Sequence, residues 1–313
     1  MDSFYVIANQ LFQFAVMLVC GYWIASKHII TRDNLKVVSD IIIRLLLPFL
    51  IFSNAVEQTT RKILFDSVDM ILLSVGIYVG LFTLQTLMAK AMGLKGGKGN
   101  IYKATTSCGN AGFLGIPLLV AAFPEHGGIY IALYSIIDQI VLWTVVIYLT
   151  TPVEQQAGFE IKRFFNPALS AIMLALVLII AGVSVPRPLE SALLTVGRAS
   201  TPMSLIYLGA LLYYSDWKAV ACSKELYVGI FVKMLFYPLA FFSVASLFFS
   251  DMPMVRAAAI ISGLPSMSAI AMLAEANHNH GEYALGMVLL TTVASLFTLS
   301  FVSYVLFGGF GIF

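Results

Sequence analysis

The stretch TTSCGNAGFLGIPLL at residues 105–119 lies within a continuous apolar segment that runs from Ile101 to Phe123. That segment is long enough to cross a membrane, since a spanning helix needs about 20 mostly apolar residues. Gly-Asn and Gly-Ile-Pro nevertheless interrupt its middle. In a helix interior, glycine costs about 1 kcal/mol and proline about 3 kcal/mol relative to alanine. The stretch therefore predicts a membrane helix that is broken near its centre.

The composition of the whole chain supports a membrane location. Hydrophobic residues make up 60% of the sequence, charged residues only 11%, and the mean hydropathy is +0.92. Because a soluble domain carries about 25% charged residues, we predict an integral membrane protein. The three cysteines, Cys20, Cys108 and Cys222, show neither a disulfide framework nor metal-binding spacing. The sequence shows no set of catalytic residues and no phosphate-binding loop. We therefore do not expect an enzyme, and we expect no bound metal and no nucleic-acid partner.

Apolar segments of membrane-spanning length recur along the chain, with short connections between them. We predict an all-α protein whose ten transmembrane helices form a first unit at 1–150, a short cytoplasmic linker at 151–165 and a second unit at 166–313. The predicted spans are 4–25, 37–56, 67–92, 101–123, 128–150, 166–183, 190–214, 225–249, 254–275 and 282–307.

The orientation of these spans follows from the basic residues. Most Lys and Arg residues outside the spans fall in the odd-numbered loops, most densely in KAMGLKGGKGNIYK at 90–103. Cytoplasmic loops carry an excess of Lys and Arg. We therefore expect a multi-pass protein of the cytoplasmic (inner or plasma) membrane with both termini on the extracytoplasmic side.

Two pairs of motifs recur in the same order in the two units. RLLLP at 44–48 in the second span matches RASTP at 198–202 in the seventh, and GIP at 115–117 in the fourth matches GLP at 263–265 in the ninth. The matched spans are five apart. Because five is odd, the two units run through the membrane in opposite senses. The motifs thus predict an inverted repeat of five helices, the alternative being unrelated proline kinks.

Broken helices at matching places in two inverted units point to a transporter site. We expect Pro117 to open a second half-helix, with Gly115 as the flexible joint, and Pro265 to do the same in the other unit. Two half-helix N-termini would then face one point near the middle of the bilayer. Each carries about half a positive charge, so the point suits an anion, above all a carboxylate.

Polar residues next to the predicted breaks are candidates for substrate binding. Asn110 can donate to a carboxylate, and Ser107 lies on the same face of the helix; in the other unit Ser266 and Ser268 flank Pro265. The alternative for Asn110 is a polar residue that bonds a neighbouring helix. For the two serines the alternative is hydroxyls bonded back onto their own helix.

Asp138 and Lys233 are charged residues inside apolar spans, where such residues are costly and usually functional. Asp138, in SIIDQIVLW, is a candidate for ion coupling by proton or cation, the alternative being a structural ion pair. The corresponding region of the last span, LLTTVASL, has Thr291 and Thr292 instead. Lys233 is a candidate for attracting an anionic substrate, but its distance from the start of its span favours snorkelling to the cytoplasmic face.

Arg44 and Arg198 occur at matching places in the two units. We expect them to brace the protein through ion pairs with Asp40 or Glu190, without contacting substrate.

Several ordered motifs of the chain resemble those of the auxin efflux carrier family, which includes bacterial malate and malonate permeases and the plant PIN-type carriers. The resemblance covers nearly all ten spans. It rests on LLLPFLIFSN at 45–54, Asn110 with GIPLL at 115–119, DQIVLW at 138–143, TPMSLIYLGALL at 201–212, VKMLFYP at 232–238 and GLPSMSAIAMLAEA at 263–276.

The resemblance implies a carrier with a scaffold of spans one, two, six and seven, often the dimer contact, and a transport part of spans three to five and eight to ten. It implies that the helices cross at Pro117 and Pro265 and that Asn110 contacts the substrate carboxylate. The long cytoplasmic loop of plant carriers is absent, since 151–165 is short.

The expected function is secondary transport of small organic anions, such as malate, malonate or auxin-like acids, by elevator-type alternating access. Malate- and malonate-like acids lead through the resemblance alone. One alternative is a sodium- or proton-coupled transporter of another solute, with Asp138 as the coupling group. Another is a membrane sensor that binds a ligand without moving it. Beyond a coupling H⁺ or Na⁺, no cofactor is expected.

Overall fold

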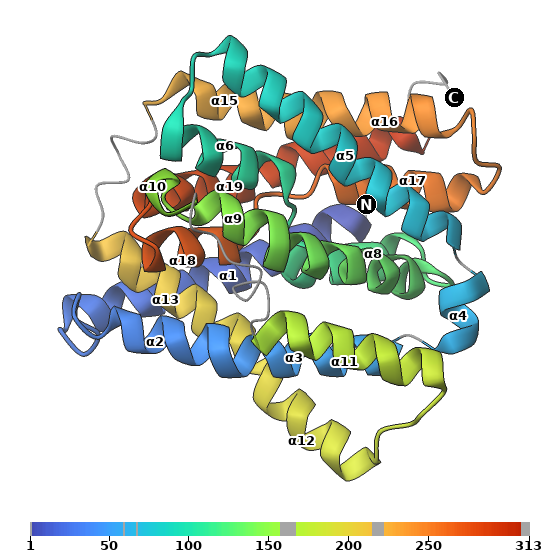
Figure 1. Ribbon diagram of the computed structural model, residues 1–313. Coiled ribbons are helices and arrows are strands. Elements are labelled where there is room, and N and C mark those ends of the chain that lie inside the picture. The colour runs from blue at the N-terminus through green and yellow to red at the C-terminus, as the bar shows by residue number, and fades with distance from the viewer. Residues whose placement is uncertain (1, 59, 67, 157–166, 215–221, 308–313) are drawn as a thin grey trace.

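The computed structural model describes residues 2–58, 60–66, 68–156, 167–214 and 222–307 (Figure 1). These residues are helical almost throughout and contain no strand beyond one isolated bridge, which confirms the predicted all-α class. Within them, four helical segments are long and apolar enough to cross a membrane: Val68–Ala91, Gly127–Thr150, Lys224–Ala245 and Gly281–Leu306. The part of the predicted linker after Gln156 lies outside the described residues.

The helices of the first half overlap the predicted spans, except for two short ones at Arg61–Asp66 and Val153–Gln156. They are α1 (Asp2–Ser26), α2 (Leu35–Ile41), η1 (Ile42–Leu46), α3 (Leu47–Gln58), α4 (Arg61–Asp66), α5 (Val68–Ala91), α6 (Gly96–Ser107), η2 (Ala111–Gly115), α7 (Ile116–Ala122), α8 (Gly127–Val141), η3 (Leu142–Val146), α9 (Ile147–Thr150) and α10 (Val153–Gln156).

The helices of the second half also overlap the predicted spans. Its helices are α11 (Pro167–Ala181), α12 (Arg187–Arg198), α13 (Ser200–Tyr214), α15 (Lys224–Phe231), η5 (Val232–Phe236), α16 (Tyr237–Ala245), α17 (Met252–Ser262), α18 (Ser268–Ala276) and α19 (Gly281–Leu306).

Three prolines within helices each follow a π-helical turn. Pro48, Pro117 and Pro238 each stand two residues after a five-residue π-helical turn, namely η1, η2 and η5. Proline lacks the N–H of a normal helical bond, and its ring clashes with the carbonyl four residues earlier. A π-turn widens the helix at that point, so the chain continues as a helix through each of these prolines.

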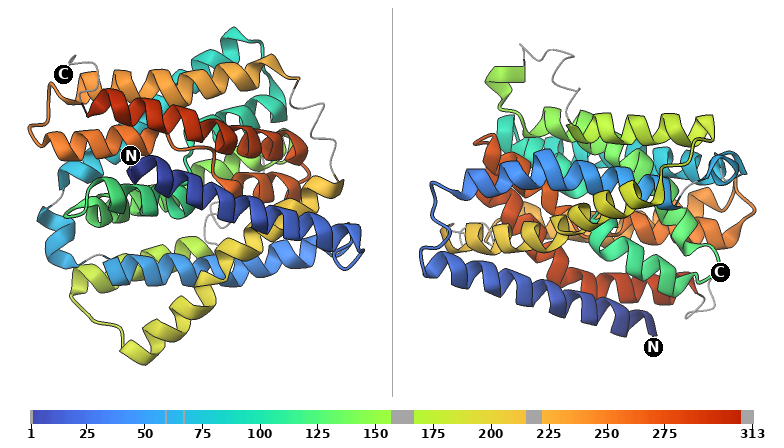
Figure 2. Two further views of the ribbon diagram at one scale, coloured as in Figure 1. Left: turned by 180° about the vertical axis from the view of Figure 1, so that it is seen from behind. Right: turned by 90° about the horizontal axis from the view of Figure 1, so that it is seen from below.

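The helices form two groups. In Figure 1, α2, α3, α11, α12 and α13 lie in the lower part of the molecule, and α5, α6, α15, α16, α17 and α19 lie above them. Helix α1 packs along α13, and α11 packs along α3 (Figure 2). Glycine allows the first of these contacts, because a Cβ on Gly21 would overlap the carbonyl oxygen of Ile206 and one on Gly209 would overlap that of Leu18.

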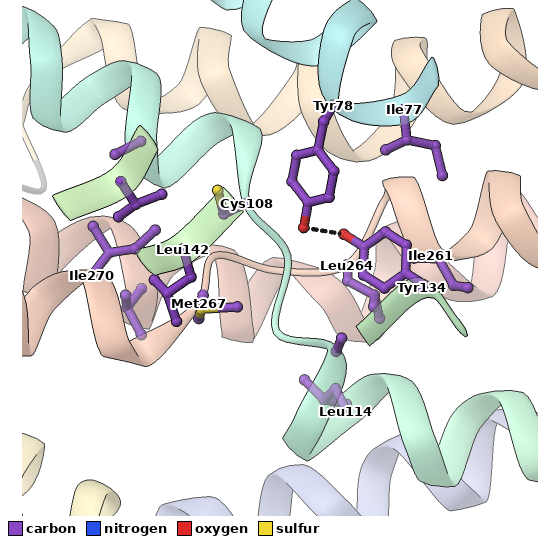
Figure 3. Close-up of a cluster of buried hydrophobic side chains, with 14 of the residues drawn as sticks. Ile77, Tyr78, Cys108, Leu114, Tyr134, Leu142, Ile261, Leu264, Met267 and Ile270 are labelled. Carbon is purple, nitrogen blue, oxygen red and sulfur yellow. Dashed lines mark hydrogen bonds between the residues drawn. The ribbon is translucent and has the colours of Figure 1, made fainter. Parts of the chain in front are cut away.

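Two helices in the core are broken, and the breaks touch. Helix α6 ends at Ser107 and the chain becomes helical again at Ala111, while α17 ends at Ser262 and α18 begins at Ser268. Gly109 and Ser266 form an isolated antiparallel bridge between the two extended segments. Figure 3 shows the two segments passing each other: one runs between Cys108 and Leu114, and the other passes near Leu264 and Met267.

Candidate functional site

The two extended segments hold each other by backbone hydrogen bonds. The N–H of Asn110 donates to the Pro265 carbonyl (2.7 Å), and the N–H of Met267 donates to the Cys108 carbonyl (3.3 Å). A broken helix leaves its terminal N–H and C=O groups without helical partners. Each break here supplies hydrogen-bond partners for the other. The interrupted helices therefore leave fewer backbone groups unsatisfied in the apolar core.

The expected role of Pro117 as the start of a half-helix is wrong. The helical segment begins six residues earlier, at Ala111, and continues from η2 into α7 through Gly115, whose φ of −62° and ψ of −49° are helical. The helix starts earlier because the Asn110 carbonyl accepts from the N–H groups of Leu114 and Gly115. Pro117 thus lies inside the second half-helix, and the break lies at Cys108–Asn110. Pro265 does lie in the other break, before α18.

Asn110 and Ser268 lie between two cavities and line both of them. Asn110 directly precedes the helical segment that begins at Ala111, and Ser268 is the first residue of α18. Both residues are buried, with 5% and 4% of their surfaces exposed. The structure therefore brings these two predicted residues, one from each half, to one place at two helix N-termini.

The first cavity, which we call the polar cavity, has a volume of about 100 Å³. Its polar lining residues come from α3, α8, α13, α18 and the break before η2: Asn54, Asn110, Ser135, Asp138, Gln139, Ser204 and Ser268. Gly112 and Ala269, from the first turns of the two helical segments, also face it. Of the described residues that line it, Asp138 alone has a formal charge.

The second cavity, which we call the apolar cavity, is larger, at about 430 Å³. It lies on the other side of Asn110 and Ser268, between α1, α13 and α19. In the described part of the chain, its one further polar lining residue is Thr292, whose hydroxyl donates to the Val288 carbonyl of its own helix (2.6 Å). This cavity therefore offers an apolar surface, made mainly by Phe12, Phe14, Leu18, Leu205, Leu208, Leu289, Val293 and Leu296.

Asp138 is buried, with 2% of its surface exposed, and is held by neutral donors. Tyr78 donates its hydroxyl to Asp138 Oδ1, and Gln139 Nε2 donates to Oδ2 (3.3 Å). The Tyr78 and Tyr134 hydroxyls are also hydrogen-bonded (2.7 Å; Figure 3), so Tyr134 is the donor in that pair. Within the described residues Asp138 forms no ion pair within 4 Å.

Lys233 does not snorkel, contrary to our expectation. It is completely buried, and its Nζ donates to the carbonyls of Thr105 (3.1 Å) and Cys108 (2.6 Å). Helix α15 begins at Lys224, so Lys233 lies about 13 Å along the helix, close to half the thickness of a hydrocarbon core. The side chain is too far from the interface to reach water, and it bonds to the end of α6 instead.

The other predicted residues have mixed outcomes. Ser266 Oγ donates to the Thr105 carbonyl (2.7 Å), and the Ser266 N–H donates to Thr291 Oγ1 (3.0 Å), so its hydroxyl bonds across to α6. Ser107 is buried but lines neither cavity. Arg44 forms the expected ion pair with Asp40 (3.0 Å).

In the second half the matching brace is absent, because the described residues show no ion pair between Arg198 and Glu190. Arg198 is exposed there.

Sequence reasoning missed several residues of this region. Asn54 and Gln139 line the polar cavity, and Tyr78 and Tyr134 hold Asp138. A signal existed for Asn54, which stands six residues after Pro48 in a span already singled out by its repeat motif. Tyr78 lies 60 residues from Asp138, and no local pattern indicates that contact.

Paired helix breaks inside apolar helices are typical of membrane transporters. A family model described as "Membrane transport protein" matches residues 6–160 and 156–303. The chain therefore belongs to this family, the auxin efflux carrier-like membrane transport family. It is 20% identical over 245 residues to the protein described as uncharacterized transporter YfdV from Escherichia coli K12, and equally similar to that of Shigella flexneri. The match covers 74% of this chain and 76% of each relative.

Proposed function

We propose that this chain is a secondary transporter of small organic anions in the cytoplasmic membrane and that it works by elevator-type alternating access. The observation that carries the proposal is the position of Asn110 and Ser268. They lie at the N-termini of two helical segments from different halves, with a cavity on each side. A solute bound there would be reached through one cavity and released through the other.

The proposal includes ten transmembrane helices in two inverted five-helix units, 1–150 and 166–313. The two cavities support this symmetry in part: α3, α8 and α11 line one, and their counterparts α13, α19 and α1 line the other, although α13 also reaches the first through Ser204. We assign α1, α3, α11 and α13 to a scaffold that forms a homodimer, with the remaining spans as the moving part. Both termini are placed on the extracytoplasmic side by the distribution of basic residues.

An anion is favoured by the electrostatics of the helix ends. The N-terminal turns that carry Gly112 and Ser268 face the polar cavity, and a helix N-terminus attracts negative charge. Asn110 supplies an amide next to both turns. The proposed carboxylate site is therefore Asn110, Gly112 and Ser268.

The charge of the cavities favours a singly charged acid over malate or malonate. Among the described residues no Lys, Arg or His lines either cavity, and Asp138 would repel a second carboxylate. Two helix N-termini together provide about one positive charge. The apolar cavity next to Asn110 suits a hydrocarbon or aromatic body. We therefore rank auxin-like monocarboxylic acids above dicarboxylic acids.

A proton-coupled mechanism is the second candidate, and one observation favours it. Asp138 faces the polar cavity and accepts a hydrogen bond from the buried Tyr78 hydroxyl, without an ion pair among the described residues. A carboxyl group in that setting is suited to binding and releasing a proton during transport. In this case Asp138→Asn would keep substrate binding but abolish the response of flux to a proton gradient.

Counterflow in proteoliposomes tests the proposed function. The purified protein is first screened by thermal shift against aromatic and aliphatic monocarboxylates and against malate and malonate, and the best hit is then used in counterflow. We expect flux of a monocarboxylate, and we expect Asn110→Ala to lower both affinity and flux by at least about tenfold. Asn34→Ala, at the half-buried residue that precedes α2, is the matched control for loss of an asparagine away from the cavities; it removes two local hydrogen bonds but should keep wild-type affinity and flux. Binding without flux would indicate a sensor, and stabilisation by cations or neutral solutes alone would contradict the anion site.

A further inference from the structure

A buried lysine stands at the junction of the two broken helices. Lys233, in the π-turn η5, has no exposed surface, and its ammonium donates to the carbonyls of Thr105 and Cys108. Both carbonyls belong to the last turn of α6 or to the break directly after it. A charged group at this depth is costly unless it has close partners. The ammonium is therefore placed where the structure most needs a positive charge.

The end of α6 creates that need. The last four carbonyls of a helix have no helical partner, and they carry about half a negative charge. Ser266 Oγ also donates to the Thr105 carbonyl, and the N–H of Met267 also donates to the Cys108 carbonyl. These donors are neutral. Lys233 contributes the only cation recorded at these oxygens among the described residues.

Asp138 adds a second negative charge nearby. Lys233 and Asp138 interact electrostatically, although they are not within ion-pair distance. The Lys233 ammonium is thus surrounded by the carbonyls of Thr105 and Cys108 and, at a longer distance, by the Asp138 carboxylate. Carbonyl and carboxylate oxygens are also the ligands that small hard metal cations prefer.

We propose that Lys233 is a built-in cation that takes the place of a bound Na⁺ or K⁺ at the crossing of the two breaks. The ammonium fixes the end of α6 against the second break by charge and hydrogen bonds, so the protein needs no metal cation at this point of its cycle. Lys233 is a positioning residue, because it lines neither cavity and acts on Asn110 through the Cys108–Asn110 segment. The proposal deepens the proposed transport function and rests on it for the flux measurements alone.

The test compares side chains of different size and charge at position 233 in different salts. Lys233→Met removes the charge but fills the space, whereas Lys233→Ala removes the charge and leaves room at the two carbonyls. Lys36→Ala, at an exposed position on α2, is the matched control for loss of a lysine. Melting temperature and counterflow of the monocarboxylate hit are measured in sodium, potassium and choline chloride at equal ionic strength.

The wild type and Lys36→Ala should give the same melting temperature and flux in all three salts. Lys233→Met should lose at least about tenfold in flux in every salt, because the carbonyls lack a cation. Lys233→Ala should be equally impaired in choline and recover several-fold in sodium or potassium, with a rise in melting temperature of a few degrees. If Lys233→Ala is too unstable to purify, its monodisperse yield after solubilisation in each salt is the readout, and it should be higher with a small cation than with choline.

Three results would overturn the proposal. The first is a wild type whose melting temperature or flux falls when choline replaces sodium and potassium. The second is a Lys233→Ala variant whose stability, flux and yield are indifferent to the cation. The third is a Lys233→Met variant equal to the wild type. Absence of flux in the wild type would contradict the transport function instead, and the salt dependence of melting, which needs no substrate, would still decide the role of Lys233.

Discussion

The polar and apolar cavities are built from corresponding helices, yet they differ in chemistry. In the register set by the repeated prolines, Asn54 stands six residues after Pro48 and Leu208 stands six residues after Pro202. Asn54 lines the polar cavity and Leu208 the apolar one. Asp138 and Thr292 differ in the same way on α8 and α19. The matched helix positions thus share an architecture, while the polar and ionisable side chains at them, Asn54 and Asp138, come from the first half.

This difference suggests how a substrate would lie. In the proposed mode of binding, the carboxylate would lie at Asn110 and Ser268, where the cavities meet, and the apolar body would occupy the space lined by α1, α13 and α19. Hydrogen bonds then select the head group, while burial of apolar surface contributes about 25 cal/mol per Å² to affinity. Substitutions at matched positions in the two halves should therefore have unequal effects.

The largest inequality is expected between Asp138 and Thr292. Asp138→Ala leaves the buried Tyr78 hydroxyl without its carboxylate acceptor and frees Tyr134, which bonds to Tyr78, from its fixed place, at a cost of about 2 kcal/mol, or a loss of roughly 30-fold. Thr292→Val removes a hydroxyl that bonds only its own helix in the described residues, so flux should stay within about twofold. Initial counterflow rates and melting temperatures of the two variants measure the contrast. Equal losses would show that the two cavities contribute equally.

A second contrast concerns the walls of the cavities. Gly209 packs against the Leu18 carbonyl on the apolar side, whereas a Cβ on Gly112 would meet nothing within 4 Å on the polar side. Gly209→Ala should separate α1 from α13 and destabilise the protein by about 1–3 kcal/mol. Gly112→Ala should leave the stability unchanged. Thermal unfolding in detergent is the measurement, and a stable Gly209→Ala variant would refute the close α1–α13 contact.

A smaller effect is expected at the register-matched pair Asn54 and Leu208. Asn54→Leu removes a polar group from the first cavity and should weaken acid binding by about 1 kcal/mol, or roughly fivefold, whatever the length of the acid. Leu208→Met keeps the apolar volume and should leave affinity nearly unchanged. Affinities for a series of acids of increasing length, measured by thermal shift, distinguish the two. An Asn54→Leu variant with unaltered affinity would place the head group elsewhere.

The smallest effect is expected from Arg44→Gln. The ion pair with Asp40 has side-chain exposures of 72% and 44%, and exposed ion pairs contribute only about 0–1 kcal/mol. Arg198 lacks such a pair with Glu190 in the described residues, so Arg198→Gln should change stability even less. Melting temperatures of both variants should lie within a few degrees of the wild type. A loss of flux in either variant would mean that the repeated arginines do more than brace the protein.

Local chemistry in the sequence was sufficient to predict the helices and the existence of the two breaks. Apolar length and the positions of glycine and proline are local signals, and Asn110, Pro265 and Ser268 were selected from them. The place of the first break was not predictable in this way. It is fixed by the bond from the Asn110 N–H to the Pro265 carbonyl, 155 residues away in the chain.

Lys233 shows the same limit for a charged residue. Its distance from the start of the span suggested an escape to the interface, but its partners are carbonyls 125 and 128 residues away. A break in another helix creates those partners, since only a helix end has free carbonyls. Whether a buried charged side chain is stabilised therefore depends on partners that are far away in the sequence.

The central claim, that an acid binds with its head group between Asn110 and Ser268, is tested most directly by locating a heavy-atom-labelled ligand. An iodinated aromatic monocarboxylate is bound to the wild type and to Asn110→Ala, and its iodine is located by anomalous diffraction. We predict an iodine peak in the apolar cavity near Leu205 and Val293, with the carboxylate at Asn110 and Ser268, and no peak in the variant. A peak outside both cavities, or one that persists unchanged in Asn110→Ala, would contradict the account.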